Sequence, residues 1–138
     1  MNGHCHCGRV RYRVAVDRFD DVGVCHCEAC RRSTGGTHVT WVTVPEDTFI
    51  WTAEPPAEYQ SSDHGKRYFC PRCGAQLAFR SSRFPGEVDI TVTTLDQPEL
   101  VPPDHHTWVR SKLPWVHLGD GLPREDEEHS PGCTEREV

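Results

Sequence analysis

The stretch Phe69-Cys70-Pro71-Arg72-Cys73-Gly74 places two thiols three positions apart around a turn. Pro71 presets the backbone for this turn, and Gly74 can adopt the left-handed conformation that closes it. A Cys-x-x-Cys turn of this kind is typical of half of a structural zinc site, which closes with four ligands. Two further ligands then have to come from elsewhere in the chain, so this stretch ties distant segments together.

Cys5 and Cys7 are the best candidates for the missing pair. In an extended strand, residues i and i+2 point to the same face, with Cα atoms about 6.6 Å apart. Inward-leaning side chains can bring their sulfurs to the spacing of about 3.8 Å that tetrahedral zinc requires. We therefore predict a closed four-thiolate zinc site that joins the N-terminal strand to the middle of the chain. Small domains with limited cores often need such a link.

A second group of thiols lies in the segment Cys25-His26-Cys27-Glu28-Ala29-Cys30. Three sulfurs from one loop can hold one ion and leave a fourth position open, which is the layout of a catalytic zinc site. The alternative is a second structural site closed by a histidine, for which the candidates are His4, His6, His26 and His38. A plant-type iron–sulfur cluster would need a four-residue gap before its Cys-x-x-Cys, and here the gap is one residue.

Length, charge and composition limit the class of protein to which this chain can belong. The chain has 138 residues, which is typical of one domain, and its formal net charge of −6 argues against a nucleic-acid partner. No segment is apolar enough for a secretory signal or a membrane span, so we expect a cytoplasmic protein with no membrane partner. In that reducing compartment, clustered cysteines indicate metal binding rather than disulfides. A homo-oligomer is compatible with these features.

Hydrophobic patterning predicts a mainly β domain. Apolar residues alternate with polar ones over 10–16 and over 88–93, as in strands with one buried face. Shorter candidate strands are 38–44, 49–51, 58–61, 66–69, 76–80 and 107–110, and residues 28–33 are expected to form a short helical turn. Residues 124–138, which contain the isolated Cys133, are acidic and free of aromatic residues. We expect them to be a disordered tail after a single domain at 1–123.

Three thiolates on one divalent cation make a site that favours a soft fourth ligand, such as another thiolate. Coordination would deprotonate an incoming thiol near neutral pH, so the chemistry inferred from these residues is thiol activation. Arg31 and Arg32 follow the last cysteine and could bind a substrate carboxylate. They are equally well interpreted as solvated surface charges.

The chain resembles the glutathione-dependent formaldehyde-activating enzyme (GFA) family, whose domain is shared with centromere protein V. The resemblance extends from Gly3 to about Pro123. It rests on four motifs: G-x-C-x-C-G (Gly3, Cys5, Cys7, Gly8), C-x-C-x-x-C-R-R (Cys25, Cys27, Cys30, Arg31, Arg32), F-C-x-x-C-G (Phe69, Cys70, Cys73, Gly74) and H-x-W-x-x-S-K-x-P-W (His106, Trp108, Ser111, Lys112, Pro114, Trp115), the last followed by Asp120-Gly121-Leu122-Pro123.

The resemblance implies a β-tent fold, in which small antiparallel sheets are held together by the four-cysteine zinc site. It implies two zinc ions per chain, a structural one at Cys5, Cys7, Cys70 and Cys73 and a catalytic one at Cys25, Cys27 and Cys30. The implied activity is that of a carbon–sulfur lyase similar to S-(hydroxymethyl)glutathione synthase, with glutathione or another small thiol and formaldehyde or another small aldehyde as partners. Candidate proton donors to the developing alkoxide are His106, Lys112 and His117.

Founding members of the family are longer than this chain, so the reaction class transfers better than the substrate. The relationship to centromere protein V also allows a non-catalytic binding module with two structural zinc sites. In either case, the site held by one loop is expected to lose zinc more readily, and therefore to be only partly occupied.

Overall fold

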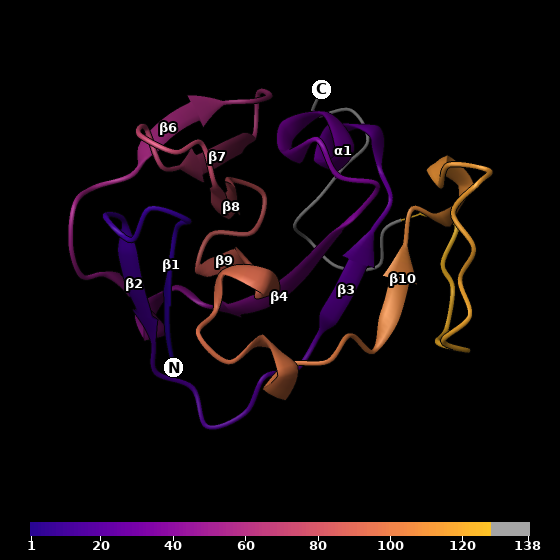
Figure 1. The fold of residues 1–138 in the computed structure, drawn as a ribbon, viewed down its shortest axis with the longest axis horizontal. Coiled ribbons are helices and arrows are strands. Elements are labelled where there is room, and N and C mark those ends of the chain that lie inside the picture. Colours follow the sequence, from indigo (N-terminus) through magenta and orange to yellow (C-terminus); the bar gives the residue numbers. More distant parts are fainter. Residues whose placement is uncertain (128–138) are drawn as a thin grey trace.

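The computed structural model describes residues 1–127, and over this range the chain is mainly β, as predicted (Figure 1). One short helix, α1, follows the third strand. The strands are β1 (Asn2–His4), β2 (Arg11–Val14), β3 (Val22–Cys25), β4 (Val39–Pro45), β5 (Phe49–Trp51), β6 (Ala57–Gln60), β7 (Gly65–Phe69), β8 (Gln76–Ser81), β9 (Glu87–Thr91) and β10 (His105–Thr107), and α1 spans Glu28–Thr34. Single 3-10 turns are η1 (Glu46–Thr48), η2 (Val92–Thr94), η3 (Pro98–Leu100) and η4 (Val109–Ser111).

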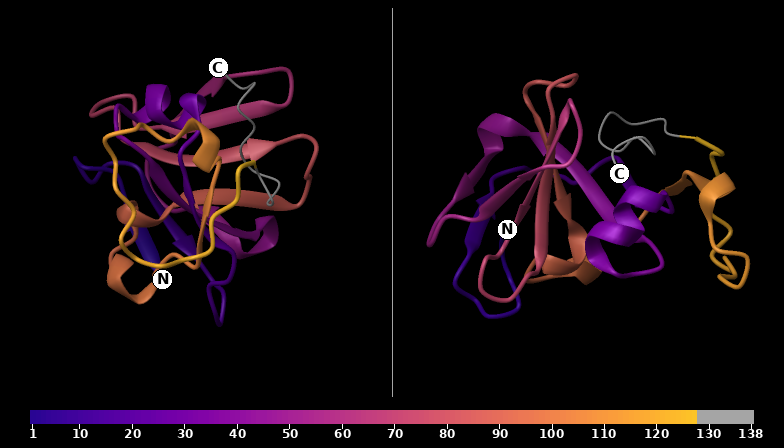
Figure 2. Two further views of the ribbon diagram at one scale, coloured as in Figure 1. Left: turned by 90° about the vertical axis from the view of Figure 1, so that its right-hand side faces the viewer. Right: turned by 90° about the horizontal axis from the view of Figure 1, so that it is seen from above.

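The strands form two sheets. A three-stranded sheet has the order β1-β2-β5, and a seven-stranded sheet has the order β10-β3-β4-β9-β8-β7-β6. Every pairing within these sheets is antiparallel except that of β10 with β3. Seen from above, the sheets lie at an angle to each other, and the segment after β10 lies at the edge of the molecule (Figure 2). The predicted fold of small antiparallel sheets is therefore confirmed, with one parallel pair added.

Most of the predicted elements correspond to observed strands, but the strand predicted at 107–110 is wrong. The observed strand β10 ends at Thr107, and residues 109–111 form η4 instead. Trp108 between them has φ of 55°, in the left-handed region, which takes the chain out of the extended conformation. The strands β1 and β3 were not predicted, because β1 is three residues long and β3 merges with the cysteine motif.

The core has two parts. The larger part lies between the sheets and is built around Tyr12, Val42, Leu77 and Ile90, each at most 1% exposed. The smaller part surrounds the second group of cysteines with the rings of three aromatic residues, Trp41, Phe79 and Trp108. Because α1 carries two residues of this smaller part, Ala29 and Cys30, it packs directly against β4. The second group of cysteines is thus part of a packed core.

The predicted tail begins inside the described residues. Arg124 forms a parallel bridge with His106, and the backbone amide of Glu125 donates to the carbonyl of His106 at 2.9 Å. Residues 124–127 therefore lie along β10. The rest of the predicted tail, residues 128–138 with Cys133, lies outside the described residues, and the division at residue 123 stays a prediction. Within 1–127, no helix has the length and apolar character needed to cross a membrane.

A buried carboxyl group lies between two central strands. Asp89 on β9 is paired directly with Thr43 on β4, whose hydroxyl donates to Oδ1 of Asp89 at 2.5 Å. Burial raises the pKa of Asp89 to about 7, with small further increases from Asp21 and Glu87, although the Thr43 hydrogen bond acts in the opposite direction. Asp89 is therefore protonated in the folded protein at pH values where an exposed aspartate is ionised.

This shift predicts a pH-dependent stability. Between about pH 4 and pH 7 the folded state holds a proton that the unfolded state has released, so the free energy of unfolding falls as the pH rises through this window. The slope approaches about 1.4 kcal/mol per pH unit for one proton. Asn at this position cannot ionise. We expect urea denaturation to show Asp89→Asn gaining at least about 1 kcal/mol relative to wild type between pH 5 and pH 8.

The matched control is Asp47→Asn, because Asp47 is an exposed residue of η1. Its stability difference from wild type should stay constant over the same pH range. A constant difference for Asp89→Asn as well would show that Asp89 is ionised in the folded protein at pH 5.

Candidate metal centres

Four cysteines meet where the N-terminal segment approaches the turn between β7 and β8. The sulfur atoms of Cys5, Cys7, Cys70 and Cys73, here called the four-cysteine cluster, all lie within 4.8 Å of one another. The Sγ–Sγ distances are 3.5 Å for Cys5 and Cys7 and 3.7 Å for Cys7 and Cys70, close to the roughly 3.8 Å expected around tetrahedral zinc. This donor set and spacing fit a structural zinc ion.

The Cys-x-x-Cys half of this cluster has the predicted form. The backbone amide of Gly74 donates to the carbonyl of Cys70 at 2.9 Å, and Gly74 has φ of 79°, a conformation that glycine adopts without strain. The amide of Cys70 in turn donates to the carbonyl of Ala75 at 3.0 Å. The chain thus reverses within five residues, which places both thiols on the inside of the turn.

The Cys-x-Cys half differs from the prediction. Cys5 and Cys7 were expected on an extended strand, but β1 ends at His4 and both cysteines lie in a turn. The amide of Gly8 donates to the carbonyl of Cys5 at 3.0 Å, and Gly8 has φ of 78°. A glycine one residue after the motif makes this turn possible, so the two halves of the cluster are similar turns that face each other.

Hydrogen bonds and neighbouring thiols give the cysteines of this cluster different pKa values. The backbone amide of Ala75 lowers the pKa of Cys73 to about 6. The amide of Arg9 also acts to lower the pKa of Cys7, but burial and the three neighbouring thiols outweigh it and raise that pKa to about 11. Four adjacent thiols cannot all ionise without a cation to offset their charge. A divalent ion would remove this conflict, which supports metal binding.

A second cluster, the three-cysteine cluster, consists of Cys25, Cys27 and Cys30, whose sulfurs also lie within 4.8 Å of one another. Cys25 ends β3, and Cys27 is the N-cap of α1, where its sulfur accepts a hydrogen bond from the amide of Cys30 at 3.3 Å. The indole Nε1 of Trp41 donates to Sγ of Cys30 at 3.4 Å. All three cysteines are at most 2% exposed. The cluster is therefore formed by local structure and shielded from solvent.

No fourth protein ligand joins this cluster within residues 1–127. No ring nitrogen of His4, His6, His26 or His38 lies within 4.8 Å of all three sulfurs. The same is true of every carboxylate oxygen of the described residues. A second structural site closed by one of these histidines therefore receives no support from the described part of the chain. Three thiols can hold a metal ion consistent with zinc, with one position left for another ligand.

Two buried histidines connect the three-cysteine cluster to an exposed carboxylate. His26, between Cys25 and Cys27, is fully buried, and its Nε2 lies 3.0 Å from Nδ1 of His106 on β10. Nε2 of His106 lies 2.8 Å from Oδ2 of Asp120. The amide of Leu122, followed by His106 itself, keeps the pKa of Asp120 below its usual value, so its side chain is an ionised acceptor.

The direction of these hydrogen bonds determines the tautomers. Because the Asp120 carboxylate can only accept, a neutral His106 ring donates from Nε2 and accepts at Nδ1, and His26 then donates from Nε2. Nδ1 of His26 is then a bare lone pair, buried and without a hydrogen-bond partner among the described residues. Burial, followed by the proximity of His106 and His38, lowers the pKa of His26 to about 4, in accord with a neutral ring.

The other predicted site residues have different surroundings. Nη1 of Arg31 donates to the carbonyls of His26 and Ser111, at 3.0 and 2.5 Å. Nζ of Lys112 donates to the carbonyls of Leu113 and Val116, at 3.2 and 2.6 Å. Arg32 forms an exposed ion pair with Glu28 at 2.8 Å, and His117 is exposed. His106 contacts His26 within the cysteine segment, and the backbone amide of Arg31 donates to the carbonyl of Cys27 at 3.1 Å. The roles predicted for all of these residues stay predictions.

Sequence reasoning did not identify the parts played by His26, Asp120 and Trp41. His26 was considered only as a metal ligand, and Asp120 appeared only as part of the late sequence motif. Their contacts depend on β10 lying beside β3, which brings residues 80 positions apart together. No local pattern marks Trp41 as a donor to a cysteine.

Comparisons with known proteins give a consistent family. The family model described as "Glutathione-dependent formaldehyde-activating enzyme" matches residues 1–111, which include both cysteine clusters. A Halomonas elongata protein named as belonging to that family is 30% identical over 126 residues, covering 86% of this chain and 80% of the relative. The crystal structure of a Rhodobacter sphaeroides protein matches with a TM-score of 0.60 and 25% identity, covering 91% of this chain and 99% of that one.

Mutation should separate the two clusters. Cys70→Ser removes a ligand that links distant segments, and we expect insoluble protein or a melting temperature lower by more than about 10 °C, because structural zinc binding contributes folding free energy. Cys27→Ser leaves that link intact, and serine is a favourable N-cap for α1. This variant should melt within about 3 °C of wild type and lose only the more weakly held zinc.

The measurement is thermal unfolding combined with zinc analysis of both variants, with Asp47→Asn, a change at an exposed residue of η1, as the control. Equal collapse of Cys27→Ser and Cys70→Ser would show that both clusters hold the fold together.

Proposed function

The chain belongs to the glutathione-dependent formaldehyde-activating enzyme family, and on that premise we propose that it activates a small thiol for addition to a small aldehyde. Glutathione or a similar thiol, with formaldehyde or another small aldehyde, would give the S-hydroxyalkyl adduct, a carbon–sulfur lyase-type reaction. The observation that carries this proposal is the buried three-cysteine cluster, open at its fourth position within residues 1–127 and placed beside a histidine with a bare nitrogen.

The reaction sets clear requirements. A carbon–sulfur bond forms as the thiol sulfur attacks the carbonyl carbon, and the electron pair of the carbonyl π bond moves to oxygen. The proton that leaves sulfur is balanced by the proton that the resulting alkoxide takes up, so no oxidant or reductant is needed. The protein therefore has to stabilise a thiolate and move one proton.

Cys25, Cys27 and Cys30 would hold zinc in this proposal. Zinc bound there would lower the pKa of a thiol that approaches it, so that the thiolate forms near neutral pH. The amide of Cys30 and the indole of Trp41 donate to two of the three sulfurs and keep them oriented. Burial of the cluster excludes water that would compete with the thiol.

The histidines supply the proton path. Nδ1 of His26 can accept the thiol proton and return it to the alkoxide, because its lone pair is not engaged with any described residue. His106 acts through His26: it accepts from Nε2 of His26 and passes its own hydrogen bond to Asp120. Of the other predicted proton donors, Lys112 is held by two backbone carbonyls and His117 is exposed, so we assign the proton transfer to His26 and His106.

The alternative is a non-catalytic binding module in which both clusters bind structural zinc. The observation that favours it is the low exposure of the three-cysteine cluster, at most 2% for each residue, which resembles a structural site more than an open one. A measurable affinity of the cluster for an added thiol separates the two functions, because a closed structural site has no position for one.

The first test is catalysis itself. Exchange NMR with glutathione and formaldehyde should show adduct formation faster with the wild-type protein than without it. Cys27→Ser should lower the protein-dependent rate by at least about 100-fold, since it removes one of the three thiols, whereas Asp47→Asn on the exposed turn η1 should leave it unchanged. An unchanged rate in Cys27→Ser would contradict the proposed role of the three-cysteine cluster.

The second test concerns the histidine chain. Asp120→Asn removes the charge that sets the His106 tautomer, and we expect kcat to fall by about 10- to 100-fold with little change in the KM for the thiol. Asp47→Asn makes the same substitution at an exposed residue of η1 and should leave kcat unchanged. A rise in KM at constant kcat for Asp120→Asn would instead assign this residue to substrate binding.

A further inference from the structure

The sulfurs of the four-cysteine cluster differ in their access to solvent. Among the cysteines within residues 1–127, Cys7 is the exposed one and Cys73 is partly buried. Cys5 and Cys70 are 0% exposed, and each residue of the three-cysteine cluster is at most 2% exposed. A small oxidant such as hydrogen peroxide therefore reaches Cys7 more readily than any other cysteine of the described chain.

A bound metal ion would make this exposure decisive. A divalent ion deprotonates the thiols that coordinate it, so all four sulfurs of the cluster would be thiolates. The thiolate is the form of cysteine that attacks a peroxide, and it has to meet the oxidant in solution. Because the four sulfurs would then be ionised alike, solvent access assigns the first oxidation to Cys7.

Cys7 has a second thiol within reach on the facing turn. Its Sγ lies 3.7 Å from Sγ of Cys70, whereas the two sulfurs of a disulfide lie about 2.0 Å apart. Sγ of Cys5 is also close, at 3.5 Å, but Cys5 and Cys7 belong to one tight turn closed by the amide of Gly8. A disulfide between residues two positions apart would distort that turn, so Cys70 is the expected partner.

Cys70 is held in place by its own turn. The backbone amides of Arg72 and Cys73 donate to Sγ of Cys70 at 3.4 and 3.5 Å. This sulfur is shielded from solvent, and its position is fixed beside the exposed Sγ of Cys7. An accessible cysteine next to a second, resolving cysteine is the arrangement in which the first is oxidised and the second forms the disulfide with it.

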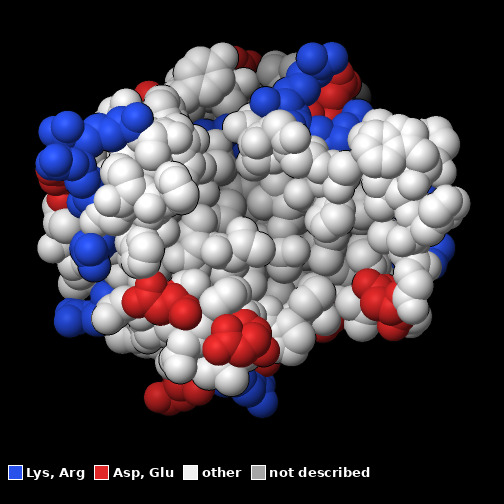
Figure 3. Space-filling model, in the orientation of Figure 1, with Lys and Arg blue, Asp and Glu red and all other residues white. Residues whose placement is uncertain are grey.

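An ion-pair bridge holds the two turns together without using sulfur. Arg9 follows the first turn and Arg72 lies within the second, and both pair with Glu54, at 3.0 and 3.4 Å. Basic side chains gather at the left edge of the molecule in Figure 3, on the side where Figure 1 places β1 and β2. Because this bridge does not depend on the thiols, it keeps the turns facing each other when the bonds of the sulfurs change.

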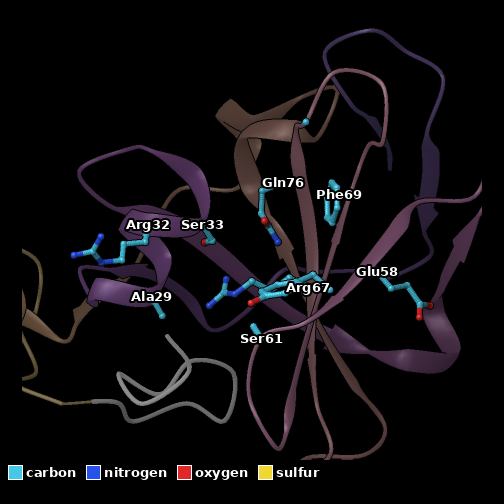
Figure 4. A pocket seen from close by; sticks show the side chains of 10 residues that line it. Ala29, Arg32, Ser33, Glu58, Ser61, Arg67, Phe69 and Gln76 are labelled. Atoms are coloured by element: carbon cyan, nitrogen blue, oxygen red, sulfur yellow. The ribbon is translucent and has the colours of Figure 1, made fainter.

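The turn between β7 and β8 has room to move. Disulfide formation has to bring the two sulfurs closer by about 2 Å. Phe69, Gly74 and Gln76, on either side of this turn, border a cavity of about 600 Å³ between α1 and the strands (Figure 4). No described atom lies within 4 Å of the position that a Cβ on Gly74 would occupy. The turn can therefore shift without displacing packed side chains.

We propose that Cys7 is a site of oxidation by hydroperoxides and that a disulfide between Cys7 and Cys70 then replaces the metal in the four-cysteine cluster. Cys5 and Cys73 would remain as thiols, too few to close a structural zinc site, so the ion is released. The disulfide joins the same two turns, so the fold keeps its link in both states. This oxidation site is independent of the chemistry proposed for the three-cysteine cluster.

The two chemical steps balance. The thiolate of Cys7 attacks one oxygen of hydrogen peroxide, so that an S–O bond forms, the O–O bond breaks and hydroxide leaves. The thiolate of Cys70 then attacks the sulfur of Cys7, so that the S–S bond forms, the S–O bond breaks and a second hydroxide leaves. The two thiolates together lose two electrons, and the peroxide gains them.

Peptide mapping of the zinc-loaded wild-type protein tests the proposal. After a time course with hydrogen peroxide, free thiols are alkylated and the chain is cleaved with trypsin. Cleavage after Arg72 separates Cys70 from Cys73, because the relevant peptides are 68–72 and 73–80, with Cys5 and Cys7 in peptide 1–9 and the three-cysteine cluster in peptide 19–31.

We expect the first disulfide to join peptide 1–9 to peptide 68–72, with Cys7 identified by fragmentation. A chromogenic chelator should detect about one zinc released per disulfide formed. Peptide 19–31 of the same samples is the internal control, and its cysteines should be oxidised at least about 10-fold more slowly because they are buried. A first disulfide at any other pair of cysteines, or zinc release without a disulfide, would overturn the proposal.

Cys27→Ser is the matched control variant, since it makes the same type of change in the other cluster. It should form the disulfide between Cys7 and Cys70 at the wild-type rate. Loss of this disulfide in Cys27→Ser would show that oxidation begins at the three-cysteine cluster, which would also overturn the proposal.

Thermal unfolding tests whether the disulfide replaces the metal as a link. Oxidised and reduced wild-type protein are stripped of zinc with the same chelator, so that they differ in the disulfide alone. Because Cys7 and Cys70 lie 63 positions apart, their disulfide restricts the unfolded chain, and the oxidised protein should melt at least about 5 °C higher. Dithiothreitol should abolish this difference. Equal melting temperatures before reduction would show that the disulfide does not take over the link.

Discussion

The fold depends on the meeting of four thiols from two turns that lie 63 residues apart in sequence. One turn follows β1 and belongs to the three-stranded sheet, while the other joins β7 and β8 of the seven-stranded sheet. Without a cation these thiols oppose one another's ionisation, as the separated pKa values of Cys7 and Cys73 indicate. A metal ion would offset this repulsion and link the two sheets.

The three-cysteine cluster has a different relation to the fold. Its ligands come from one local segment, so an ion there would close no long loop, and packing by Trp41, Phe79 and Trp108 holds the segment in place. Such a site is free to carry chemistry, because its ligands need not also join the sheets. Its neighbours supply what thiol chemistry needs: low solvent access, amide and indole donors to sulfur, and a neutral histidine with a bare nitrogen.

Local pattern predicted much of this organisation. The spacing of the cysteines predicted both clusters, and the alternation of apolar and polar residues predicted most strands. Both patterns depend on residues that are close in the chain. The chain from His26 through His106 to Asp120 depends on the parallel pairing of β10 with β3, which no local pattern encodes. Arg67 on β7 is buried with its guanidinium 5.0 Å from the ring centroid of Phe79, its cross-strand partner, a contact that no local pattern encodes.

Helix α1 contacts several parts of the structure that are far apart in the sequence. Its Cys30 belongs to the three-cysteine cluster, its Ser33 lines a cavity beside β7 and β8, and its Arg31 donates to the carbonyl of Ser111 in the segment that leads to Asp120. A helix of seven residues is too short to be stable alone, so these contacts define its position. These contacts fix the orientation of Cys30 and join α1 to the segment that leads to Asp120.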